Sequence, residues 1–224
     1  MFTLSALLPS LYHHLLGAHL QPAARPVANG LDLSALVGAL GWSRLPPAVK
    51  KRFASAHEEV TYEGRMDLHC SHIGRAYAIM ARWVGGPLTT FNSCAVPTTV
   101  RVSDNGLGGI VWERCFHADS SARDCVVRST KELGSDGGLL ERTDGGLSMS
   151  LHVFEEAGAL VFLSHRFWLV WGRFRLPVPA LLTPGTCRVV HKDLGGGFFR
   201  FTLSMVHPLW GETFRQTGVF ADPV

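Results

Sequence analysis

Residues 110–116 have the pattern of a β-strand with a charge on its apolar face. Side chains alternate between the two faces of a strand, so Trp112 and Arg114 share the face that also carries the other bulky apolar side chains of the segment. An isolated buried charge costs several kcal/mol, so Arg114 needs a partner or a ligand. Two later strand-like segments supply acidic candidates, Glu141 and Glu212.

Further polar side chains lie in or beside strand-like segments with large apolar neighbours. Arg142, Arg166 and Arg215 are, with Trp112 and Arg114, the candidate ligand-binding residues, because a planar guanidinium grips a carboxylate or phosphate. If the protein is an enzyme, the two glutamates and His165 are its candidate acids and bases. The same charges also suit structural ion pairs or a solvated outer face, and the sequence leaves both interpretations open.

Other kinds of site find little support in the sequence. The eleven histidines lack metal-ligand spacing: His13 and His14 are neighbours, and His69 and His72 would lie on opposite faces of a strand. No GxSxG segment marks a nucleophile, and no GxGxxG segment follows a strand to open a helix. We therefore expect neither a metal nor a cofactor.

Composition points to one globular domain. The 224 residues are 46% hydrophobic and 17% charged, which excludes general disorder. The net charge of +3 is not gathered into a patch, so a nucleic-acid partner is not expected. Five cysteines, with no CxxC spacing and no evident leader, favour reduced thiols and a cytoplasmic location.

Helical spacing dominates the first part of the chain, and a period of two dominates the remainder. The predicted helices share apolar stripes and Pro or Gly boundaries, and they cover residues 4–20, 32–40, 46–57 and 74–84. The predicted strands alternate in polarity or are short apolar runs between Gly, Asn and Asp turns, and they cover residues 60–68, 94–102, 109–117, 123–130, 138–143, 147–154, 160–171, 188–193, 197–207 and 213–220.

These elements predict a mainly β (α+β) protein, in which a curved antiparallel meander or open barrel follows N-terminal helices. Residues 1–58 would form the helical segment, and residues 59–224 the antiparallel β domain with one inserted helix, all within a single compact unit. The amphipathic first helix either packs on its own domain or contacts a partner or membrane surface.

Several short motifs resemble a known family. They are Leu11-Tyr12 with Leu15-Leu16-Gly17, the run from Trp112 to Phe116, Leu140-Glu141-Arg142, Leu176-Pro177-Val178-Pro179, and the run from His207 to Glu212 followed by Gly218. Their order and spacing are similar to the bacterial domain of unknown function numbered 4166. Members of that family are sometimes joined to a reductase-like dinucleotide-binding domain, which we do not expect in this chain. The resemblance implies the fold and supplies no reaction.

Three functional hypotheses follow from the sequence. The first is binding of a small, largely apolar ligand, possibly with an acidic headgroup, in the concavity of the sheet. The second is a cofactor-free isomerase, cyclase or hydrolase that uses a buried Glu/Arg pair in the same pocket. The third is an accessory module that docks through its first helix. The identity of the ligand, the oligomeric state and the pathway do not follow from the sequence.

Overall fold

The computed structural model describes residues 30–54, 59–83, 86, 88–117, 124–172 and 174–223. Within these ranges the chain is mainly β. Its strands are β1 (Val60–Cys70), β2 (Ser93–Asp104), β3 (Ile110–Phe116), β4 (Cys125–Leu133), β5 (Leu139–Thr143), β6 (Leu147–Glu156), β7 (Ala159–Trp171), β8 (Phe174–Val178), β9 (Thr186–Gly195), β10 (Phe198–His207) and β11 (Gly211–Ala221). Its helical segments are α1 (Leu33–Val37), α2 (Ala39–Arg44), α3 (Pro47–Arg52), α4 (His72–Arg82) and the 3-10 turn η1 (Ala180–Leu182).

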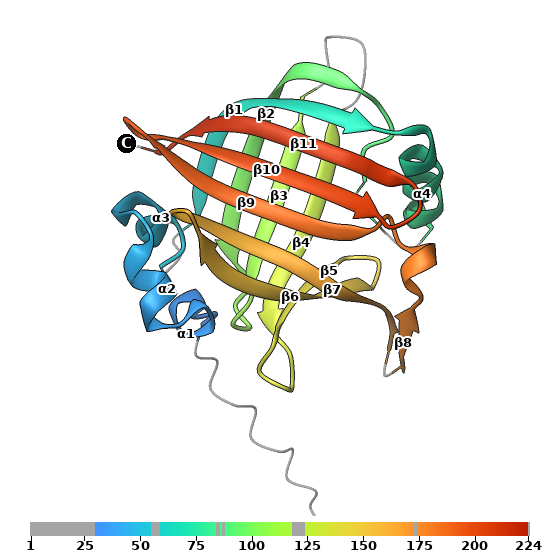
Figure 1. Ribbon diagram of the computed structural model, residues 1–224, viewed down its shortest axis with the longest axis horizontal. Helices are drawn as coiled ribbons and strands as arrows, with labels where there is room; N and C mark the ends of the chain where they lie inside the picture. Colours follow the sequence, from blue (N-terminus) through green and yellow to red (C-terminus); the bar gives the residue numbers. More distant parts are fainter. Residues whose placement is uncertain are drawn as a thin grey trace, which may run out of the picture.

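The strands form an antiparallel barrel. Each strand from β1 to β7 pairs with the next along the chain, β7 pairs with β9, and β11 returns to pair with β1. The β6–β7 pairing therefore closes ten of the eleven described strands into a ring, and β8 is a short branch on the far half of β7. In Figure 1, β9, β10 and β11 cross in front of β3, β4 and β5 at a steep angle. The space between these two layers is the interior of the barrel.

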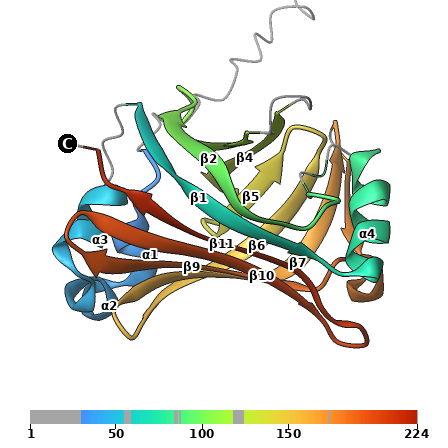
Figure 2. The same cartoon turned by 90° about the horizontal axis from the view of Figure 1, so that it is seen from above.

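Helices lie at both ends of the barrel (Figure 2). Asp32 caps α1 by accepting hydrogen bonds from the backbone N–H groups of Ser34 and Ala35, and Gly38, with a φ of 79°, separates α1 from α2. At the opposite end, the Ser71 side chain caps α4. No helix in the described ranges has the length and apolar character needed to cross a membrane.

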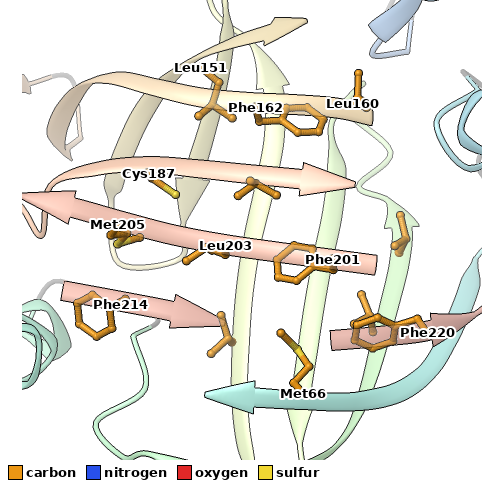
Figure 3. Packing of buried hydrophobic residues seen from close by; sticks show 14 of the residues in the cluster. Met66, Leu151, Leu160, Phe162, Cys187, Phe201, Leu203, Met205, Phe214 and Phe220 are labelled. Atoms are coloured by element: carbon orange, nitrogen blue, oxygen red, sulfur yellow. The ribbon is translucent and has the colours of Figure 1, made fainter. Parts of the chain in front are cut away.

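A continuous apolar core fills much of the barrel. Figure 3 shows Phe201, Leu203 and Met205 following one another along β10, with Phe220 on the neighbouring β11. Gly64 is required opposite Phe220, because a Cβ atom at Gly64 would lie 2.3 Å from the Val219 carbonyl oxygen and 2.6 Å from the Phe220 ring. The missing side chain therefore lets β1 and the Phe220 ring approach closely.

The mainly β, antiparallel prediction is confirmed, and all ten predicted strands are present. The pattern missed β8, whose Pro177 is unusual in a strand but is tolerated on this short edge strand. The single helix predicted for residues 32–40 was wrong, since Gly38 divides it and α2 continues to Arg44. The predicted helix at residues 4–20 lies outside the described residues, and the division at residue 58 stays a prediction.

Candidate functional site

The barrel encloses a mostly apolar cavity of ≈ 80 Å³. Its wall combines aromatic and aliphatic side chains with a few polar groups, all from the inner faces of the strands or from segments that close the ends. The aromatic lining consists of Tyr62, Trp112, Phe167, Phe199, Phe201 and Phe220. The ionisable groups that the described residues place on the wall, apart from Tyr62, are Arg114, Lys131, Glu141 and His191.

Glu141 is held by two neighbours on β4. Its Oε1 accepts a hydrogen bond of 2.6 Å from the Ser129 hydroxyl, and its Oε2 lies 3.3 Å from the Lys131 Nζ. Burial favours the neutral carboxylic acid, but Lys131, the Ser129 hydrogen bond and Arg114 outweigh burial and hold the pKa of Glu141 below its ordinary value. Glu141 is therefore an ionised carboxylate at neutral pH.

Lys131 sits between Glu141 and aromatic rings. Its Nζ lies 5.2 Å from the centre of the Trp112 ring and 5.4 Å from that of Phe162. Cation–π contact and the ion pair together compensate its burial. The charge of Lys131 is thus balanced within the barrel.

Arg114 is buried with a ring contact but without an ion pair to any of the described residues. Its Cζ lies 5.5 Å from the centre of the Phe201 ring, and its Nε has no hydrogen-bond partner among the described residues. Burial lowers the pKa of the guanidinium, while Glu141 opposes that effect from beyond ion-pair distance. Arginine remains protonated in proteins, so within the described part of the chain Arg114 presents an unpaired cation to the cavity.

His191 is enclosed by aromatic rings. The Phe53 ring meets it edge-on with centroids 4.9 Å apart, and the Phe201 ring does so at 5.3 Å. Burial, together with the positive charges of Lys131, Arg52 and Arg114, lowers the pKa of His191 well below its ordinary value. The ring is consequently neutral, and its buried Nδ1 has no hydrogen-bond partner in the ranges that the structure describes.

The described groups give the cavity one excess positive charge. Two cations, Arg114 and Lys131, face one carboxylate, Glu141, and His191 is neutral. An apolar enclosure makes this excess costly unless an anion joins it.

Arg52, the last residue of α3, and its C-cap Phe53 pack against one end of the barrel. Phe53 packs against Trp112, Phe162 and His191. Arg52 donates hydrogen bonds to Asp222 and Asp193. These two residues join α3 to that end of the barrel.

A comparison with known protein families identifies the family of this chain. The family described as "Domain of unknown function (DUF4166)" matches residues 45–220. The chain belongs to that family. The match spans every cavity-lining residue named above and nearly all of the barrel. A search of curated proteins finds no significant match.

Among solved structures, the crystal structure of a point mutant of the fluorescent protein UnaG is similar to this DUF4166 chain. The two share 15% sequence identity, with 74% of this chain and 95% of the other covered, and a TM-score of 0.32. A likeness of this size does not bear on function.

Of the predicted site residues in this DUF4166 barrel, three line the cavity: Trp112, Arg114 and Glu141. Arg142, next to Glu141 on β5, is exposed on the opposite face and pairs with Glu132. Glu212 and Arg215 pair with each other near the start of β11, outside the cavity.

His165 and Arg166 lie on the outer face of β7. The β6–β7 register shifts between Ser150 and Leu151, which leaves His165 as the extra residue of a bulge, so alternation fails there. Both side chains border an outer groove of ≈ 870 Å³ between β7, β8 and the η1 segment. They do not share a pocket with Arg114.

Sequence reasoning missed Lys131, Ser129 and His191. The fourth predicted strand ended one residue short of Lys131, although the period-two pattern 127, 129, 131 continues through it. His191 follows Val189 on the inner face of β9. Strand alternation would have placed Lys131 and His191 on the inner face. The sequence did not show where β4 ends or which face of β9 is the inner one.

Proposed function

We propose that the barrel binds a small, largely apolar ligand carrying one carboxylate, and that Arg114 is the contact for its anionic group. The observation that carries this proposal is a buried guanidinium, whose Nε has no partner among the described residues, facing a cavity with one excess positive charge. A single bound carboxylate would neutralise the excess and satisfy the orphaned donor.

The surroundings of Arg114 suit the apolar part of such a ligand. Phe201 and Trp112 supply ring surfaces, and Met149 and Met205 supply flexible side chains. The neutral His191 ring lies beside Phe201, and its Nδ1 has no hydrogen-bond partner in the described part of the chain. This nitrogen offers the ligand one further polar contact.

Cavity size sets the class of ligand. A volume of ≈ 80 Å³ is smaller than an apolar cavity of about 150 Å³ that holds benzene. A ligand with more than a few heavy atoms therefore has to displace interior side chains, and the two methionines are the most adaptable of these. We expect short- or medium-chain carboxylates to bind better than bulky ones.

The enzyme alternative has less support. An acid catalyst needs a raised pKa, whereas the pKa of Glu141 is lowered, and both of its carboxylate oxygens are already engaged. Glu212 and His165, the other candidate acids and bases, lie outside the cavity.

The first test is native mass spectrometry of the purified full chain, followed by denaturing extraction of anything released. A co-purified monocarboxylate supports the proposal. A co-purified cation or a strongly polar compound contradicts it.

The second test uses isothermal titration calorimetry to compare the affinity of octanoate with that of octanol, the uncharged control. A hydrogen bond to a charged group contributes about 1.5–3 kcal/mol, so octanoate should bind about 10- to 100-fold more tightly than octanol. Arg114→Gln should remove that difference, while Arg142→Gln, on the outer face, should preserve it. Equal affinities for octanoate and octanol in the unmodified protein would overturn the proposal.

A further inference from the structure

Three potential metal ligands meet on the outer face of the barrel. Cys115 is the penultimate residue of β3 and His117 directly follows the strand, so the two side chains lie on the same side of the chain. Asp124 immediately precedes β4, which pairs with β3. Arg114 lies on the opposite face of β3, so this cluster is separate from the cavity.

Two of the three separations between the ligand atoms match those of a tetrahedral zinc site. The Cys115 Sγ lies 3.7 Å from the His117 Nδ1 and 3.6 Å from the Asp124 Oδ2, and the last two atoms are 3.0 Å apart. Ordinary zinc bond lengths around a tetrahedral ion give about 3.6 Å for both sulfur separations and about 3.4 Å for the nitrogen–oxygen separation. Only the nitrogen–oxygen pair has to move apart.

A second contact orients the histidine. The His117 Nε2 lies 2.8 Å from the Thr99 hydroxyl oxygen on the neighbouring β2. When Nε2–H donates to Thr99, the neutral imidazole keeps the lone pair of Nδ1 for a metal. Metal-binding histidines in proteins are commonly fixed through their second nitrogen in this way.

The same geometry does not suit nucleophilic catalysis. In a Cys/His/Asp relay, the thiol and the carboxylate contact different ring nitrogens of the histidine. Here both contact Nδ1. The three groups converge on one point rather than forming a line.

We propose that Cys115, His117 and Asp124 bind Zn²⁺, with solvent as the fourth ligand. One thiolate, one imidazole and one carboxylate in tetrahedral array are a donor set that zinc favours. The His117 and Asp124 side chains are 42% and 47% exposed, so the ion has access from solvent. This site was not expected from the sequence, where histidine spacing alone was considered and the Cys-x-His pair was overlooked.

The test is titration of the chelator-treated full chain with Co²⁺, followed by absorption spectroscopy. We expect one Co²⁺ per chain, a thiolate-to-cobalt charge-transfer band and the intense visible bands of tetrahedral cobalt, all displaced by Zn²⁺. Cys115→Ser should remove the charge-transfer band, whereas Cys94→Ser, which alters an exposed thiol elsewhere, should retain it.

Thr99→Val tests the orienting contact and should weaken Co²⁺ binding by about 10-fold or more, since outer contacts of metal ligands contribute about 10- to 100-fold in affinity. Far-UV circular dichroism establishes that each variant is folded. An unmodified protein without the tetrahedral cobalt spectrum, or a charge-transfer band that persists in folded Cys115→Ser, would overturn the zinc proposal. Neither result affects the proposed carboxylate site, which lies inside the barrel.

Discussion

Lys131 and Glu141 face each other on the paired strands β4 and β5, with the Lys131 Nζ 3.3 Å from the Glu141 Oε2. Because Glu141 is committed to Lys131 and Ser129, it does not pair with Arg114. The buried ion pair thus leaves the guanidinium available to a ligand. The same balance of charges governs how the interior should respond to mutation and to pH.

Glu141→Gln should destabilise the protein by about 3–5 kcal/mol, because it leaves two buried cations without a carboxylate. Urea unfolding of the ligand-free protein measures this change. Glu132→Gln is the matched control, since it breaks a partly exposed pair with Arg142 and should cost about 1 kcal/mol or less. If both variants lose the same small amount, Glu141 does not neutralise the interior.

Replacing both members of the buried pair should be far milder than removing the acid alone. In the double variant Lys131→Met, Glu141→Leu, the net interior charge remains that of Arg114, and apolar side chains replace groups whose desolvation is costly. We expect a stability within about 1–2 kcal/mol of the unmodified protein. A double-mutant cycle that shows strictly additive losses would indicate that the two side chains are not coupled.

Much of the barrel could be predicted from local patterns, and so could the place of Arg114. β3 has no register shift against β2 or β4, so the apolar residues that share a face with Arg114 give its direction correctly. The same rule places Glu141 inside and its neighbour Arg142 outside. Glu141 and Arg142 are consecutive in a strand and therefore cannot both face the cavity, although both were predicted as site residues.

The remaining parts of the site depend on features that are not local. The contact between Lys131 and Glu141 requires the register of β4 against β5, and residue spacing does not give that register. His165 and Arg166 lie at a bulge, where one extra residue changes which side chains face outward. The aromatic enclosure of His191 comes from α3, β3, β7 and β10, which are distant in sequence.

Cysteine reactivity should distinguish the interior from the surface. Burial and the nearby Glu141 carboxylate raise the pKa of Cys187 to about 12, so its thiol stays protonated at pH 8. Iodoacetamide at pH 8 should modify the exposed Cys94 in the folded protein and leave Cys187 unmodified, as peptide mass spectrometry would show. Both should react in urea. Labelling of Cys187 as fast as Cys94 in the folded state would mean that the interior opens readily.

The protein should lose stability as the pH falls below about 6.5, and His191 should be the main cause between pH 6.5 and 5. The pKa of His191 is well below its ordinary 6.5 in the folded state, because of burial and nearby cations, whereas the unfolded chain takes up the proton near 6.5. The stability that neutral His191 contributes to the folded protein is therefore fully present above pH 6.5. It declines as the pH falls, by up to about 1.4 kcal/mol per pH unit. The lowered pKa of Glu141 acts in a separate range, at and below its ordinary value of 4.5.

His191→Phe should flatten the pH dependence of stability between pH 6.5 and 5 in urea unfolding, while His152→Asn, at an exposed position, should preserve it. If the pH dependence of stability is unchanged in His191→Phe, another group takes up the proton. That result would contradict the assignment of His191 as a neutral group in the cavity.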